Sequence, residues 1–128
     1  MKISMKQIEA VVALSAHKRY ARFIKLAADQ RLVWGLHLNG WALAGTDDGM
    51  PVFPLWPARE YAELCVGGSW ADYVPKSIEL DDLFDGLLPS LDANGTKLGV
   101  FYTAGDKGVL PNLADFERDL RAELARIE

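Results

Sequence analysis

The feature that most constrains the fold is the dipeptide Asn39-Gly40, which separates two segments rich in apolar and aromatic residues. A two-residue type I′ turn needs a positive φ at both of its central positions, and Asn-Gly satisfies that need best. The sequence therefore predicts an antiparallel hairpin made of strands 31–38 and 41–46.

The register of this hairpin decides which side chains face the core. A two-residue turn pairs Leu38 with Trp41, and one face of the hairpin then carries large apolar residues. The other face carries mainly small residues, which let a helix or another backbone approach closely, so we expect both faces to be covered. The large face consists of Trp34, Leu36, Leu38, Trp41 and Leu43, and the small face of Val33, Gly35, His37, Ala42 and Ala44.

Helical periodicity flanks this hairpin. Ser4 and Ser15 each precede apolar residues at helical spacing, which predicts two N-terminal helices. Residues 51–56 form a third strand, which we expect to lie at a sheet edge or to end early because Pro51 and Pro54 lack a backbone donor. Further helices are expected to start at Pro57, at Asp81 or Asp82, and after Pro111, with short strands near 77–80 and over 97–103.

These elements predict an α+β fold. Two N-terminal helices precede an antiparallel β-meander, and alternating helices and short strands lead to a C-terminal helix. With 128 residues, half of them hydrophobic, the chain is long enough for one core and too short for two. We therefore expect a single domain over residues 1–128.

Charge is distributed unevenly along the chain. Residues 1–31 carry seven Lys or Arg and two Asp or Glu, whereas residues 32–95 carry two and ten. This pattern is typical either of a basic segment docked on an acidic one or of an acidic surface facing outward. Lys18, Arg22 and Lys25 form a stripe that we interpret as a solvated helix face, because no aromatic residue or Gly-rich loop accompanies it to bind nucleic acid. The N-terminus lacks the apolar run of a signal peptide and no segment could span a bilayer, so we expect a cytoplasmic protein without a membrane partner.

The chain resembles a bacterial family, the domain of unknown function 2750. The resemblance is carried by KQIEAVVALSAHKRYARFIKLAAD (Lys6–Asp29), VWGL (Val33–Leu36), GWAL (Gly40–Leu43), FPLWPAREYAELC (Phe53–Cys65), Trp70 and IELDDLFD (Ile78–Asp85). The FPLWPAREYAELC stretch is the most specific part. The resemblance implies a small α+β fold and no assigned reaction, so it supplies no catalytic residue.

Residues suited to catalysis or metal binding are few. His17, His37 and Cys65 lie in three different predicted elements, and a metal site needs converging ligands. Cys65 lies beside apolar neighbours on a predicted helix, which indicates an inert, buried thiol. Ser69 follows two glycines but lies in neither a nucleophile elbow nor a phosphate loop. We therefore predict no catalytic residue, no bound metal and no cofactor.

The candidates for an interaction surface or a ligand pocket are acidic and aromatic. Asp47 and Asp48 occupy a turn, and Asp81 and Asp82 begin a helix, so each pair also has a purely structural explanation. Aromatic candidates accompany them in the same half of the chain, and exposed tryptophans near acidic groups are typical of protein-binding hot spots. These aromatic candidates are Trp56, Tyr61 and Trp70.

The leading functional hypothesis is a non-enzymatic interaction module that binds a basic protein through an acidic, aromatic surface. A small acidic domain that neutralises a basic effector, as toxin-immunity proteins do, is one form of it. The alternative is an enzyme or small-ligand-binding protein with a pocket between the FPLWP segment, Gly67-Gly68 and the helix start at Asp81–Asp85. A third possibility is a homodimer in which exposed aromatic residues meet their own copies.

Overall fold

The computed structural model describes residues 3–127 and confirms the α+β class. Helices precede the strands, and a long helix closes the chain, as the sequence predicts. The elements in order are α1 (Met5–Val12), α2 (Ala16–Gln30), β1 (Leu32–His37), β2 (Ala44–Gly45), β3 (Pro51–Leu55), α3 (Arg59–Glu63), the 3-10 turn η1 (Gly68–Trp70), β4 (Val74–Glu79), α4 (Leu80–Asp82), the π-helical turn η2 (Leu83–Leu87), α5 (Leu88–Asn94), β5 (Lys97–Val100) and α6 (Leu113–Ile127).

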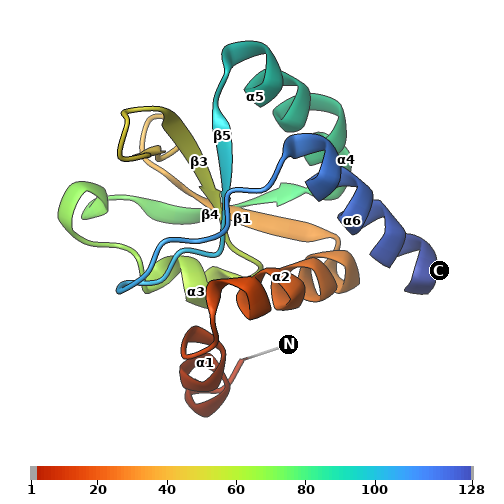
Figure 1. Ribbon diagram of the computed structural model, residues 1–128. Coiled ribbons are helices and arrows are strands. Elements are labelled where there is room, and N and C mark those ends of the chain that lie inside the picture. Colours follow the sequence, from red (N-terminus) through yellow and green to blue (C-terminus); the bar gives the residue numbers. More distant parts are fainter. Residues whose placement is uncertain (1–2, 128) are drawn as a thin grey trace.

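The strands fan out through the middle of the molecule and the helices surround them (Figure 1). The helix α2 packs against α6, although the two are far apart in the sequence. Both N-terminal helices begin at the predicted caps, because Ser4 Oγ accepts from the Gln7 amide and Ser15 Oγ accepts from the Lys18 amide. Within the described part of the chain, no helix is both long and apolar enough to cross a membrane.

The strand pairing differs from a simple meander. β1 pairs with β4 in an antiparallel two-stranded sheet. The other sheet has three strands with β3 in the middle, and β3 pairs antiparallel with β2 and parallel with β5. The two groups of strands meet at Trp34 and Trp56, whose backbone amides each donate to the other's carbonyl at 2.8 Å. The long connection from β3 to β5 carries α3, β4, α4 and α5, as a parallel pair requires.

The predicted hairpin register is wrong by one residue. The connecting loop holds three residues, Leu38 to Gly40, and His37 instead of Leu38 faces Trp41. Asn39 does adopt a left-handed conformation (φ 55°), but Gly40 has φ 153°, so the turn is not type I′. A slip of one residue changes which residues of the second segment share a face with those of β1. Val33, Gly35 and Ala42 of the predicted small face are buried, as is Leu36 of the large face, whereas Leu38 and Leu43 are exposed.

The edge position predicted for the third strand is also wrong, and the placement of Pro54 explains why. The Leu55 carbonyl accepts from the Phe101 amide, so Leu55 presents its polar groups to the β5 side. The neighbouring residue Pro54 therefore presents its backbone to the opposite side. There β2 has already ended at the Ala44–Val52 pair, so no ladder hydrogen bond is lost.

A buried arginine holds the segment that follows β5. Arg19 of α2 is 1 % exposed, and its guanidinium donates to the carbonyls of Leu14 (2.6 Å), Phe101 (3.2 Å) and Lys107 (3.3 Å) and to the Asp106 carboxylate (2.9 Å). Phe101 adopts a positive φ of 66°, which is unusual for a residue with a side chain. This network fixes residues 101–107 against the N-terminal helices.

The helix predicted to start at Asp81 or Asp82 is interrupted by the π-helical turn η2. Pro89 follows in the first turn of α5, where its missing amide hydrogen costs little. Leu80, Leu83, Phe84, Leu88 and Leu91 are buried along this segment, and Gly95 ends it in a left-handed conformation. The segment thus keeps an apolar inner side and leaves its carboxylates outside.

Candidate functional site

Tyr61, one of the predicted candidate residues, lines a cavity between helices. It lies on the short helix α3, is 2 % exposed, and packs its ring against Phe101 with a centroid separation of 4.9 Å. Its hydroxyl makes no hydrogen bond with any residue between 3 and 127. Burial raises the pKa of Tyr61, and the nearby positive charge of Arg22 opposes that shift. The phenol therefore remains a protonated donor at neutral pH.

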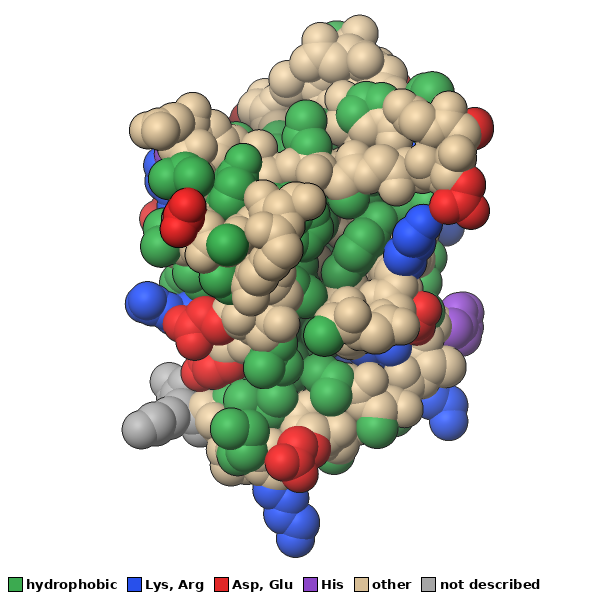
Figure 2. Space-filling view, turned by 90° about the vertical axis from the view of Figure 1, so that its left-hand side faces the viewer, with side chains coloured by type: hydrophobic (Ala, Val, Ile, Leu, Met, Phe, Trp, Pro, Cys, Tyr) green, Lys and Arg blue, Asp and Glu red, His purple; other side chains and the backbone are tan. Residues whose placement is uncertain are grey.

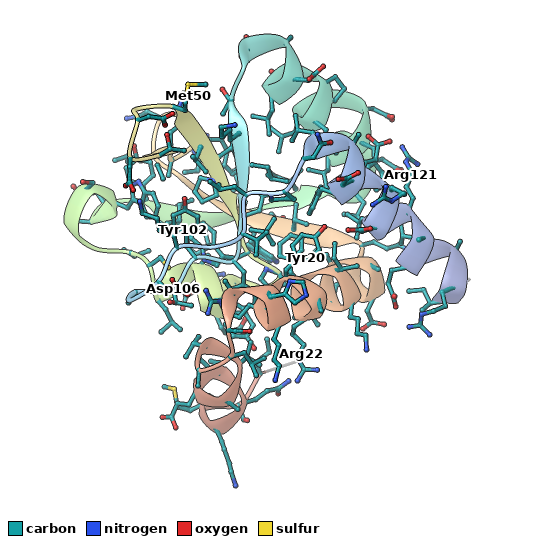
Figure 3. The ribbon with its side chains drawn as sticks, in the orientation of Figure 1. Tyr20, Arg22, Met50, Tyr102, Asp106 and Arg121 are labelled. Carbon is teal, nitrogen blue, oxygen red and sulfur yellow. The ribbon has the colours of Figure 1, made fainter. Side chains whose placement is uncertain are left out.

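The cavity has a volume of about 270 Å³ and lies where four helices meet. α2 supplies one wall, α1 and α6 supply others, and Tyr61 of α3 contributes its buried ring. Arg22 leaves α2 on the side where α1 lies, opposite to Tyr20 (Figure 3). The lining consists of Gln7, Arg22, Lys25, Leu26, Asp29, Tyr61, Glu123, Arg126 and Ile127.

Cations exceed anions around this cavity. Arg126 forms an ion pair with Glu123, and this contact lowers the pKa of the Glu123 carboxyl. Arg22 and Lys25 are exposed and form no ion pair with any described residue, and Asp29 is the remaining carboxylate of the lining. This excess of basic side chains beside a hydroxyl donor suits an anionic group.

Five exposed acidic residues occur along the end of β4 and the α4–α5 segment. None of them forms an ion pair with a residue of the described chain. These carboxylates, here called the acidic face, belong to Glu79, Asp81, Asp82, Asp85 and Asp92. Asp81 also borders a groove of about 400 Å³ with Gln30, Arg31, Leu32, Glu79 and Leu80.

Asp47 and Asp48 lie at the tip of the β2–β3 turn, and each makes a contact with the protein itself. Asp48 accepts a hydrogen bond from the Thr46 hydroxyl, which lowers the pKa of its carboxyl. Asp47 accepts from Lys107 Nζ of a distant segment at 3.0 Å, and both side chains are exposed. Turn chemistry therefore explains Asp48, and an exposed ion pair explains Asp47.

Trp56 is fully buried, which excludes it from an exposed surface. Its indole Nε1 donates to the Tyr102 carbonyl at 2.9 Å, and its ring meets Trp70 edge to face at a centroid separation of 6.1 Å. Trp70 is half-buried on η1. The pair thus joins the segment after β3 to the segment before β4.

The pocket expected between the FPLWP segment, Gly67-Gly68 and Asp81–Asp85 is not assembled in that form. Trp56 is enclosed in the core, Tyr61 faces the four-helix cavity, and Asp81 borders the groove next to Arg31. The face seen in Figure 2 carries hydrophobic side chains through its middle and charged side chains mostly towards its edges. The seven predicted candidates therefore lie in four separate places: the β2–β3 turn, the Trp56–Trp70 contact, the cavity at Tyr61, and the helix start at Asp81 and Asp82.

Metal ligands do not gather in the described structure. Between residues 3 and 127, no three His, Cys, Asp or Glu side chains come close enough to hold a metal ion. Cys65 is partly buried, with Sγ 3.4 Å from the Tyr102 carbonyl oxygen, and burial raises the pKa of its thiol to about 11. It is therefore a protonated thiol and a poor nucleophile at neutral pH.

Sequence reasoning missed the basic half of the cavity. Arg22 and Lys25 are part of the stripe interpreted as a solvated helix face, and Arg126 is more than a hundred residues away in the chain. The available sequence indication was the 3-residue spacing of Arg22 and Lys25 on a helix, which places both on one side. The identity of the residues facing them depends on how α1, α3 and α6 pack.

Comparison with known proteins identifies one family. No curated protein and no solved structure matches the chain significantly. The model of the family described as "Protein of unknown function (DUF2750)" matches residues 20–120, which is most of the chain. This range begins in α2 and ends in α6, so it includes all the strands and α3. The cavity residues of α2 and α3 lie within it, whereas Gln7 of α1 and the cavity residues of α6 lie outside it. The chain therefore belongs to the DUF2750 family.

Proposed function

We propose that the protein is a non-enzymatic, cytoplasmic interaction module whose acidic face binds a basic protein. The observation that supports this proposal is the acidic face itself, whose five exposed carboxylates have no ion-pair partner among residues 3–127. Like charges that are not neutralised within the protein repel one another. A partner with complementary charge relieves that repulsion.

Complementary charge mainly accelerates encounter and rejects wrong partners. The binding of such a partner is therefore expected to weaken as salt is added, because the Debye length falls to about 8 Å at physiological ionic strength. An acidic domain that neutralises a basic effector protein is one form of this module. The buried position of Trp56 removes it from the surface, so the proposal rests on charge rather than on exposed tryptophans.

The test is capture from a lysate of the native organism at about 0.05 M and about 0.3 M salt. Three baits are compared: the unchanged protein, the double variant Asp81→Asn/Asp82→Asn, and the matched control Glu9→Gln/Asp72→Asn. Both variants remove two exposed carboxylates that form no ion pair with a described residue, but only the first alters the acidic face.

The expected result is a basic protein that is captured at low salt by the unchanged protein and the control, and is lost with the acidic-face variant. Purified partner should then show an association rate that falls with salt for the unchanged protein and less steeply for the acidic-face variant. Capture that ignores both salt and the Asp81→Asn/Asp82→Asn change contradicts the proposal. No capture under either condition contradicts it as well.

A further inference from the structure

We infer that the cavity at Tyr61 is a binding site for a small organic anion carrying a carboxylate or a phosphate. This inference does not rest on the acidic face, because the cavity lies between α1, α2, α3 and α6, and none of its lining residues belongs to that face. Three observations on the described residues support it: an accessible hydroxyl donor without a partner, an excess of positive charge, and a small volume.

The unused donor is the Tyr61 hydroxyl. The Tyr61 ring is buried, but its hydroxyl oxygen reaches the open space of the cavity, since no enclosed side-chain polar atom lacks a hydrogen-bond partner among residues 3–127. The hydroxyl makes no hydrogen bond with a described residue, so it is free to donate to an acceptor in the cavity. Tyr61 lines the cavity, so the cavity is where this hydroxyl can find an acceptor.

The acceptor is expected to be negative because of the surrounding charges. Arg22 and Lys25 lie one helical turn apart on α2, and both border the cavity without an ion pair to a described residue. Arg126 forms an ion pair with Glu123, and the positive charge of Lys25 also lowers the pKa of the Glu123 carboxyl. The lining carries the three cations Arg22, Lys25 and Arg126 and the two carboxylates Asp29 and Glu123. It therefore keeps one net positive charge, which suits a monoanion or a dianion.

The remaining lining defines the rest of the ligand. Leu26, Ile127 and the Tyr61 ring give the cavity an apolar portion beside its basic portion. A volume of about 270 Å³ is at the lower end of the usual range for ligand pockets. The cavity therefore fits a small anion with a short apolar body rather than a nucleotide or a peptide.

The experiment titrates three probes into the full-length protein and follows backbone amide chemical shifts by NMR. Benzoate supplies a carboxylate on an apolar ring, inorganic phosphate supplies the anion alone, and benzamide is the neutral analogue of benzoate. Saturable shifts confined to residues of the cavity are expected with benzoate, with phosphate, or with both, and none with benzamide. Binding of benzoate alone identifies a carboxylate with an apolar body as the preferred class, and binding of phosphate alone identifies a phosphate group.

Variants separate a specific site from a generally basic surface. Arg22→Gln and Tyr61→Phe are each expected to weaken anion binding about tenfold, because each removes one donor to a charged acceptor. Lys18→Gln is the matched control, since Lys18 lies on the same helix α2, is exposed, and does not line the cavity. It should leave the affinity unchanged.

Tyr61→Phe carries a second, independent readout. If the hydroxyl serves only the ligand, its removal should leave the urea unfolding midpoint of the ligand-free protein unchanged or slightly higher. A saturating anion should raise the midpoint of the unchanged protein and raise that of Tyr61→Phe much less. The inference is refuted if neither anion produces saturable shifts up to about 10 mM, or if Lys18→Gln weakens binding as much as Arg22→Gln.

Discussion

Replacing the buried Arg19 by methionine should cost about 3–5 kcal/mol of the free energy of unfolding, because it leaves backbone acceptors without their donor. Methionine retains most of the side chain's volume but none of its donors. The change leaves three backbone carbonyls, those of Leu14, Phe101 and Lys107, without the guanidinium that they now accept from.

The magnitude follows from the burial of these acceptors. The Phe101 contact is fully buried and the other two are partly buried. An unsatisfied buried acceptor costs about 1–3 kcal/mol, with the partly buried ones at the lower end of that range. Asp106 adds little, because its side chain is 57 % exposed and regains water when the ion pair is lost.

The assay is equilibrium unfolding in urea, followed by tryptophan fluorescence, for Arg19→Met and for the comparison variant Asp106→Asn. Asp106→Asn should lose less than about 1 kcal/mol, because it removes only the solvent-exposed partner. The reasoning is refuted if Arg19→Met is as stable as the unchanged protein, as happens when a hydrophobic replacement packs well in place of a buried charge. It is also refuted if the two variants are equally destabilised.

Three further predictions concern the same part of the molecule. Gly108→Ala should destabilise the fold by about 1–3 kcal/mol in the same urea assay, because an added Cβ would lie 2.0 Å from the Val100 carbonyl oxygen; an unchanged midpoint would show that the backbone yields freely there. Alkylation of Cys65 by iodoacetamide should be slow at pH 7 and accelerate towards the thiol pKa of about 11; a fast reaction at neutral pH would contradict the raised pKa. Since the folded state keeps this proton to a higher pH than the unfolded chain does, the thiol's contribution to stability should decline as the pH rises from about 9 to about 11. Trp56→Phe should lose about 1–3 kcal/mol, because it leaves the Tyr102 carbonyl without the indole donor at 2.9 Å; the absence of any loss would show that Cys65 alone satisfies that oxygen.

Local structure could be predicted well from the sequence where neighbouring residues decide it. Ser4 and Ser15 mark helix starts as expected, because capping depends on residues within one turn. Glu117 and Arg121, which lie four residues apart on α6, likewise form an ion pair at 2.8 Å. The α+β class is the sum of such local preferences.

Strand pairing and the site could be predicted less well, because both depend on contacts between distant segments. Asn39-Gly40 indicates a reversal of the chain, but two-residue and three-residue loops are both compatible with it, and they give opposite faces. The partner of β1 is β4, about forty residues later, and no local pattern identifies it. In the cavity, Tyr61 was a candidate from its aromatic character alone, whereas Arg22 and Lys25 acquire a shared role only through the packing of α1, α3 and α6 around them.

The network around Arg19 also has a consequence for synthesis on the ribosome. Arg19 and its Phe101 acceptor are 82 residues apart in the chain. At about 5–20 residues per second, roughly 4–16 s separate the appearance of the guanidinium from that of this acceptor. During that interval α2 cannot reach its final environment, since burying the charge without its acceptors is strongly unfavourable. We therefore expect the nascent chain to reach its native state only after residues 101–107 have left the exit tunnel, and a chain that stops before them to remain open to proteases.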